Sequence, residues 1–158
     1  MARWKEFEAT AGEIAVAGRR TLVGDDGVAI AFLATAGEVA RATPHLAPVC
    51  PIFAGDDLYL SAAGRSPKVR DLREGGGFAL HAFLGANDEE FQVAGRAIEV
   101  DDLDERTRVH EAIAFPAFDR DDPIFRFDIR RALWVYWERV GQPDTKAVRK
   151  RWTEKGKG

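Results

Sequence analysis

The segment LYLSAAGRSPKVRDLREGGG, residues 58–77, decides how this chain is interpreted. Its first part has the apolar character of a strand and loses its bulky side chains from Ser61 to Gly64. Ser66 followed by Pro67 predicts the start of a helix, because a serine hydroxyl can cap free amides and proline has no amide proton to lose there. The helix should end in the glycines at positions 75–77. The segment therefore predicts a strand, a connection and a short capped helix.

The start of this helix carries an unusual concentration of positive charge. Lys68 and Arg70 fall in the first turn, and Arg65 comes just before it. Cations at the positive end of a helix dipole are disfavoured by roughly 0.3–1 kcal/mol each. A bound anion would remove this conflict, because free amides, dipole and cations would all face it. The segment predicts a phosphate site at Ser61, Arg65, Ser66, Lys68 and Arg70, and a solvated basic turn is the alternative.

The composition describes one domain, residues 1–158, without a disulfide framework. The chain has 158 residues, 46% of them apolar, a formal net charge of -3 and one cysteine. This is enough for one core, and the negative balance argues against a general nucleic-acid binder. No apolar run approaches the about 20 residues that span a bilayer, and the N-terminus lacks a secretory apolar core. We expect a cytoplasmic protein with neither membrane nor nucleic-acid partners.

The whole chain predicts strands in hairpin order with helices between them. Strands are expected at residues 28–35, 44–53, 58–62, 78–83, 90–100 and 125–140. Helices are expected at 4–20, 66–75 and 101–114, turns at 54–57 and 85–89, a loop at 115–123, and a basic, partly loose tail at 141–158. This order predicts a mainly β fold, an antiparallel barrel at about 28–140 with helices outside a filled interior.

Prolines and one glycine add detail to two of these strands. Pro44, Pro48 and Pro51 each remove a ladder donor, so the strand at 44–53 should lie at an edge, contain a bulge or leave one backbone side for a ligand. Gly95 predicts a bulge or a close approach within the strand at 90–100.

The spacing of the histidines and the cysteine predicts neither a metal site nor a catalytic nucleophile. His45, His81, His110 and Cys50 lack the recurrent spacing of zinc ligands, so no metal site is predicted. His45 and Cys50 are an odd number of positions apart on one predicted strand and should face opposite sides. Cys50 is therefore interpreted as an inert core residue.

Five segments occur in an order that carries a family likeness. They are FLAT (32–35), TPHLAPV (43–49), LYLS (58–61), SPKVRDL (66–72) and FQVAGRA (91–97), and SPKVRDL is the most specific. Together, over roughly residues 14–140, the chain resembles the pyridoxamine 5′-phosphate oxidase-like FMN-binding split-barrel family. The resemblance implies a six-stranded antiparallel split barrel that forms a homodimer, with a flavin in each of two clefts between the subunits.

The resemblance also implies which residues hold the flavin. Lys68 and, with it, Arg70 would bind the phosphate, and the strand that opens at His45 would present its backbone to the ring. The implied set of cofactor-binding residues is His45, Ala47, Pro48, Val49, Leu60, Ser61, Ser66, Pro67, Lys68, Arg70, Glu90 and Trp137. Glu90 stands where the oxidase tends to have a glutamine and Pro67 where it tends to have an arginine. Its pyridoxal-phosphate-binding residues have no counterpart, so vitamin oxidase activity is not expected.

The preferred function is that of an FMN-dependent oxidoreductase acting on a small organic substrate. The flavin would perform the redox step, and no side chain is assigned a catalytic role. One alternative is a deazaflavin coenzyme, whose longer acidic tail could use Arg65, Arg70 and Arg73. Others are a non-enzymatic flavin- or haem-binding protein, and a barrel that binds single-stranded nucleic acid, which the net charge opposes.

Overall fold

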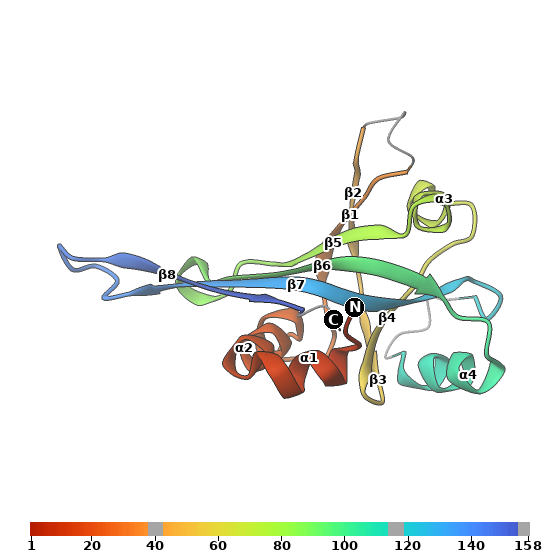
Figure 1. The fold of residues 1–158 in the computed structure, drawn as a ribbon, viewed down its shortest axis with the longest axis horizontal. Coiled ribbons are helices and arrows are strands. Elements are labelled where there is room, and N and C mark those ends of the chain that lie inside the picture. The colour runs from red at the N-terminus through yellow and green to blue at the C-terminus, as the bar shows by residue number, and fades with distance from the viewer. Residues whose placement is uncertain (38–42, 114–118, 155–158) are drawn as a thin grey trace.

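The computed structural model describes residues 1–37, 43–113 and 119–154 as one antiparallel sheet with helices packed on it (Figure 1). The strands are β1 (Ala31–Thr35), β2 (His45–Val49), β3 (Ile52–Ala54), β4 (Asp57–Ser61), β5 (Gly77–Ala82), β6 (Glu90–Glu99), β7 (Ile124–Glu138) and β8 (Lys146–Thr153). The helices are α1 (Trp4–Ala11), α2 (Glu13–Leu22), α3 (Pro67–Glu74), α4 (Leu103–Ala112) and the short 3-10 helix η2 (Ala86–Asp88). The mainly β fold is confirmed. The described residues form eight strands where six were predicted.

The sheet curls into an open barrel, and the two strands at its edges, β2 and β3, follow each other directly in the chain. Its order is β2-β1-β5-β6-β7-β4-β3, and β8 pairs with β7. Only Cys50 and Pro51 separate β2 from β3, although these strands lie at opposite edges. The single strand predicted at 44–53 is therefore wrong: the chain passes from one edge to the other at Pro51, which has no amide to continue a ladder. The predicted edge position is confirmed, since β2 pairs with β1 alone among the described strands.

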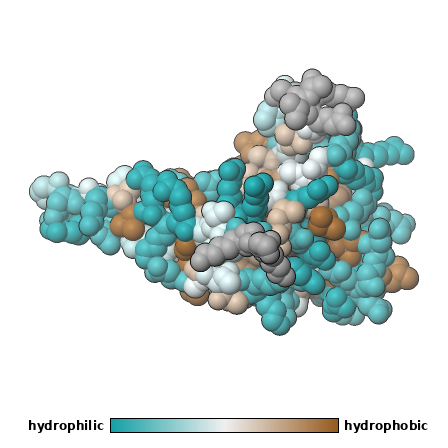
Figure 2. Space-filling view, in the orientation of Figure 1, coloured by the Kyte–Doolittle hydropathy of each residue, from teal (hydrophilic) through white to brown (hydrophobic). Residues whose placement is uncertain are grey.

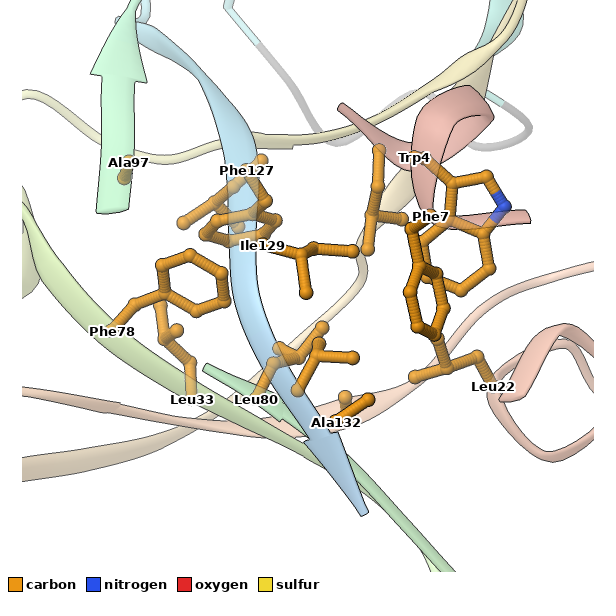
Figure 3. Packing of buried hydrophobic residues seen from close by; sticks show 14 of the residues in the cluster. Trp4, Phe7, Leu22, Leu33, Phe78, Leu80, Ala97, Phe127, Ile129 and Ala132 are labelled. Carbon is orange, nitrogen blue, oxygen red and sulfur yellow. The ribbon is translucent and has the colours of Figure 1, made fainter. Parts of the chain in front are cut away.

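The hydrophobic core joins the sheet to the N-terminal helices (Figure 3). Phe127 and Ile129 of β7 lie at its centre, and Trp4 and Phe7 of α1 enter it from the helical side; all four are 0% exposed. One helix was predicted at 4–20, but Gly12, at a φ of 52°, separates α1 from α2. The helices thus complete the core, which differs from the predicted barrel with an already filled interior.

A bulge joins β6 to β7 at Gly95. The register of the two strands shifts between Ala94 and Gly95, so that Arg130 of β7 has no residue opposite it on β6. A Cβ atom on Gly95 would lie 2.0 Å from the carbonyl oxygen of Asp128. The prediction of a bulge or close approach at Gly95 is confirmed. The bulge also explains why the apolar alternation of β7 is interrupted at Arg130 and Arg131.

The far half of β7 and the strand β8 form an arm that projects from the body, at the left of Figure 1. β8 pairs with residues 131–138 of β7, whereas β4 pairs with β7 only at residues 124–126. Beyond residue 126, the edge of β7 that pairs with β4 is unoccupied by β4, and β8 pairs there. The prediction of a partly loose tail is therefore wrong for residues 146–153. Figure 2 shows the arm as mostly hydrophilic. Residues 155–158 lie outside the described part of the chain.

The remaining local predictions agree with the structure. The turn at 54–57 joins β3 to β4 in a hairpin, and α4 begins after Asp102, whose carboxylate accepts the Glu105 amide at 2.7 Å. The predicted strands at 28–35 and 78–83 are β1 and β5. The predicted loop at 115–123 falls partly outside the described residues.

Candidate functional site

Two buried hydroxyls without partners flank the connection from β4 to α3. Ser61 ends β4 and is 3% exposed, and Ser66 is the N-cap residue of α3. The main-chain oxygen of Ser66 accepts the amide of Val69 at 3.1 Å, but the Ser66 side chain makes no capping bond. The predicted hydroxyl cap is therefore wrong. The Oγ atoms of Ser61 and Ser66 are buried and have no hydrogen-bond partner in the described structure. Because buried polar groups are rarely left unpaired, both hydroxyls mark this connection as a candidate polar site. Ser66 also lines a cleft, whereas Ser61 is buried like the rest of β4.

Three cations at the same place have no carboxylate partner. Arg65, Lys68 and Arg70 form no ion pair with any residue that the structure describes. Arg73 differs, since it donates to both oxygens of Glu99 at 2.9 and 2.6 Å. The first turn of α3 contains no acidic residue. The start of α3 thus keeps the uncompensated positive charge that an anion site needs.

A cleft opens at the start of α3. It has a volume of about 350 Å³ and is lined by Gly64, Arg65, Ser66, Pro67, Arg70, Arg73 and Glu74. The Ser66 hydroxyl and the guanidinium groups of Arg65 and Arg70 line it, while Lys68 lies in the first turn of α3 outside the lining. Such donors suit a phosphate group, whose oxygens accept several charge-assisted hydrogen bonds. The donor set therefore fits the predicted phosphate.

The edge strand β2 lies beside this helix. His45, Ala47 and Val49 are half-buried or buried, whereas Leu46 and Pro48 are exposed, which is the alternation of a strand. Among the described strands only β1 pairs with β2. Within the described residues, the main-chain groups on the other side of β2 have no strand partner.

A hydrogen-bonded triad ties β2 to α3. His45 Nδ1 lies 2.6 Å from Oδ2 of Asp71, and Thr35 Oγ1 donates to the same oxygen at 2.8 Å. Thr35 and Asp71 are each 2% exposed. Neither residue was predicted as part of the site, although Asp71 is the acidic residue of SPKVRDL and Thr35 is the polar residue that ends an apolar strand.

The ionisation of Asp71 follows from these contacts. Burial alone would raise its pKa, but the hydrogen bonds from His45 and Thr35 and the nearby charge of Arg70 outweigh burial, so the pKa of Asp71 lies below its ordinary value. The side chain is therefore a carboxylate at neutral pH and accepts both hydrogen bonds.

Replacing Asp71 by asparagine should lower the free energy of unfolding at pH 6 more than at pH 3. Because the folded pKa is depressed, the ionised carboxylate stabilises the fold above its unfolded pKa of about 3.9, and this contribution is lost as the pH falls through the folded pKa. Urea unfolding of both proteins at the two pH values measures the difference. Asp144→Asn, at a half-exposed carboxylate, is the control, and a gap that does not shrink at pH 3 would contradict the assignment.

Three predicted residues lie away from this site. Leu60 is 1% exposed within the core, so its side chain is not accessible to a ligand. Glu90 and Trp137 lie at the arm end of β6 and β7, whereas Glu99, at the other end of β6, pairs with α3 (Figure 1). A ten-residue strand such as β6 spans about 30 Å, at about 3.3 Å per residue. Within one chain, Glu90 and Trp137 cannot join the start of α3 in a single site.

A second polar cluster ties the N-terminus to β4, β7 and α4. Arg3 pairs with the buried carboxylate of Asp57, the Tyr59 hydroxyl donates to Glu105 at 2.7 Å, and Arg126 lies 3.4 Å from Glu105. Burial and the Glu105 hydrogen bond raise the pKa of Tyr59, so its hydroxyl stays protonated. Both cations have carboxylate partners, so this cluster stabilises the fold and is not an anion site.

Other chemistry is limited in the described part of the chain. It contains no group of three or more His, Cys, Asp or Glu side chains that could hold a metal ion. Cys50 is half-buried, and burial raises the pKa of its thiol, which makes it a poor nucleophile. None of the described helices has the length and apolar character needed to cross a membrane.

The open antiparallel barrel, whose two edge strands are connected by Cys50 and Pro51, gives this chain a split-barrel fold. No family model matches the sequence, and no curated protein does. Among solved structures, a NimC/NimA family protein from Clostridium acetobutylicum has a TM-score of 0.62 at 11% identity, covering 91% of this chain and 96% of that one. A Listeria innocua protein described as a candidate pyridoxamine 5′-phosphate oxidase has a TM-score of 0.54 at 16% identity, covering 65% and 85%.

A heme binding protein from Mycobacterium smegmatis is also similar, with a TM-score of 0.57 at 14% identity over 84% of this chain and 57% of that one. At these identities the comparisons establish the fold. The chain has the split-barrel fold of pyridoxamine 5′-phosphate oxidase-like proteins, and the likeness seen in the sequence is confirmed at that level.

Proposed function

We propose that this chain binds FMN and works as a small flavin-dependent oxidoreductase on a small organic substrate. The observation that carries the proposal is the cleft at the start of α3, where Ser66, whose hydroxyl has no hydrogen-bond partner among the described residues, lies with Arg65 and Arg70. A phosphate group satisfies such a set at once, because its oxygens accept from hydroxyl, ammonium and guanidinium donors. The edge strand β2, bonded to α3 through His45, supports a ring site next to it.

The roles of the residues follow from their chemistry. Ser61, Ser66, Lys68 and Arg70 would hold the phosphate, and the main chain of β2 would face the ring. Bound FMN supplies the redox chemistry, because its ring accepts or donates a hydride. This chain contributes binding and orientation.

The proposal includes a homodimer in which the arm of one copy reaches the α3 site of the other. Glu90 and Trp137 would then come from the second copy, since their own chain holds them about a strand length of roughly 30 Å away. Phe32 on β1, Leu46 on β2 and Phe83 after β5 are 41%, 69% and 42% exposed, and such apolar side chains suit an interface between copies.

Two other ligands are alternatives to FMN in this fold. A deazaflavin coenzyme is supported by the unpaired Arg65 and Arg70, while Arg73, the third cation considered for it, is already bound to Glu99. Haem is suggested by the similarity to a heme binding protein. The absorption spectrum of the purified protein separates the three, because flavin, deazaflavin and haem absorb differently.

Replacing Lys68 by alanine should weaken FMN binding by about tenfold to a hundredfold, since a charged hydrogen bond to a phosphate contributes about 1.5–3 kcal/mol. Riboflavin, which lacks the phosphate, should lose almost nothing. Fluorescence titration of both flavins measures this, with Lys5→Ala as the control, because Lys5 pairs with Asp56 on the surface. Equal losses for FMN and riboflavin would contradict the phosphate assignment, and a wild-type protein that takes up no FMN would contradict the proposed function.

A further inference from the structure

A row of side chains crosses the face of the sheet that lies opposite the core. The register places one residue of each of β1, β5, β6, β7 and β8 in this row: Phe32, His81, Gln92, Leu133 and Arg151. Their neighbours Leu80, Val93 and Ala132 are buried in the core, and successive side chains of a strand point to opposite faces. The row therefore lies on the outer face, where each of its members is half-buried or exposed.

The next row on this face is built from short side chains. It runs across the same five strands through Ala34, Ala79, Ala94, Arg131 and Thr153. Two cavities of about 220 and 550 Å³ open over β6, β7 and β8, and both are lined by Ala94, Arg131 and Thr153. They form one depression, the outer trough, whose floor is low because an alanine side chain ends at Cβ. Gln92 and Leu133 of the first row also line it.

The outer trough carries uncompensated positive charge. Its lining includes three cations: Arg130, Arg131 and Arg151. None of them forms an ion pair with a residue in the described ranges, since Asp128 of β7 and Glu154 after β8 are paired with other cations. Glu90, two positions before Gln92, does not line either cavity. A guanidinium group presents a planar fork of N–H donors that matches the two oxygens of a carboxylate.

We propose that the outer trough binds a small organic acid, with its carboxylate on Arg131 and Arg151 and its apolar body over Leu133 and Ala94. Arg131 and Arg151 come from neighbouring strands and line the same cavity. The side chains of Gln92 and Thr153 add an amide and a hydroxyl that can donate to the same anion. The acid is held by hydrogen bonds and apolar contact, without a covalent step. The outer trough shares no lining residue with the cleft at the start of α3, so this inference does not depend on the proposed function.

NMR titration of ¹⁵N-labelled protein with sodium benzoate tests the site, with benzamide and acetate as matched probes. Benzoate should bind saturably and shift the amide signals of Arg131, Leu133 and Arg151. Benzamide lacks the charge and acetate lacks the ring, so each should bind at least about tenfold more weakly.

Replacing either arginine by glutamine should identify the anion contact. Arg131→Gln and Arg151→Gln should each weaken benzoate binding by about tenfold to a hundredfold, because each removes a charged hydrogen bond. Arg149→Gln is the matched control and should change nothing. Arg149 is exposed on the same face of β8 as Arg151, but it lines neither cavity.

The outcomes separate this inference from the proposed function. A wild-type protein that does not bind benzoate overturns the inference, and so does binding that both arginine variants retain. Inorganic phosphate that binds as tightly as benzoate overturns the assignment to an organic acid. Should the variants not fold, the wild type decides, because equal binding of benzoate and benzamide contradicts the arginine contacts. Benzoate binding without FMN uptake leaves this inference standing and overturns the proposed function, and FMN uptake without benzoate binding does the reverse.

Discussion

Replacing Gly95 by alanine should destabilise the fold by about 3 kcal/mol or more, at the upper end of what overpacking costs. The added Cβ atom would lie 2.0 Å from the carbonyl oxygen of Asp128 and 3.0 Å from the amide nitrogen of Arg130. Both are main-chain atoms of β7, so no side chain can rotate away to make room. Because small domains are stable by only about 5–15 kcal/mol, the midpoint of urea unfolding should fall markedly.

Gly77→Ala is the matched control for this prediction. Gly77 lies in β5, next to β6 in the sheet, and a Cβ atom there meets nothing within 4 Å. The substitution should be neutral or stabilise the strand by up to about 1 kcal/mol, because glycine has the larger entropy loss on folding. If both substitutions have the same small effect on the free energy of unfolding, the close approach of β7 to Gly95 is contradicted.

Gly95 also illustrates which parts of the fold the sequence could predict. A bulge glycine, a hairpin turn and prolines on an edge strand are local signals, and each was interpreted correctly in type. The helix start at Ser66 and Pro67 was also located, although the Ser66 side chain makes no capping bond. The division of residues 44–53 is different, because a strand pattern does not say which neighbour each half pairs with. β8 was missed for a related reason: its residues alternate with many charges, and only the free edge of the long β7 makes them a strand.

The candidate site also contains residues that local sequence predicts and residues that only the fold brings together. Ser61, Ser66 and Lys68 belong to one short segment, so helix electrostatics alone pointed to them. Asp71 meets Thr35 and His45 across 36 and 26 positions of sequence, and no spacing rule could pair them. The conflict between cations and helix dipole predicts an anion at the start of α3, and this stays a prediction. The hydroxyl of Ser66, predicted to cap the helix, has no hydrogen-bond partner among the described residues.

The position of the arm links the fold to the proposed function. β7 takes part in the barrel through β4 and β6 and then leaves it with β8, so the two halves of one strand serve two places. Trp137 lies near the end of β7 and is 42% exposed. It is too far from the α3 site of its own chain to contact a ligand bound there. A composite site, with the phosphate end on one copy and the aromatic end on the other, gives both halves a role.

A heterodimer that carries Lys68→Ala on one chain and Trp137→Ala on the other should therefore recover the tight flavin binding that each variant loses alone. In each homodimer both sites lack one contact, which costs about 1.5–3 kcal/mol for the lysine and about 1–3 kcal/mol for the stacked ring. In the heterodimer one site lacks both contacts, but the other combines an intact Lys68 with an intact Trp137.

Co-expression of the two variants with different tags, followed by purification on both tags, isolates the heterodimer. FMN titration should then show about half the wild-type number of sites at wild-type affinity, because a twofold dimer holds two equivalent sites and one of them is restored. A heterodimer of wild type with the double variant is the control: each of its sites lacks one contact, so it should bind as weakly as the single variants. Light scattering that shows a monomer with full flavin affinity, or a heterodimer with no tight site, would contradict the shared site, because each chain would then bind flavin through its own residues alone.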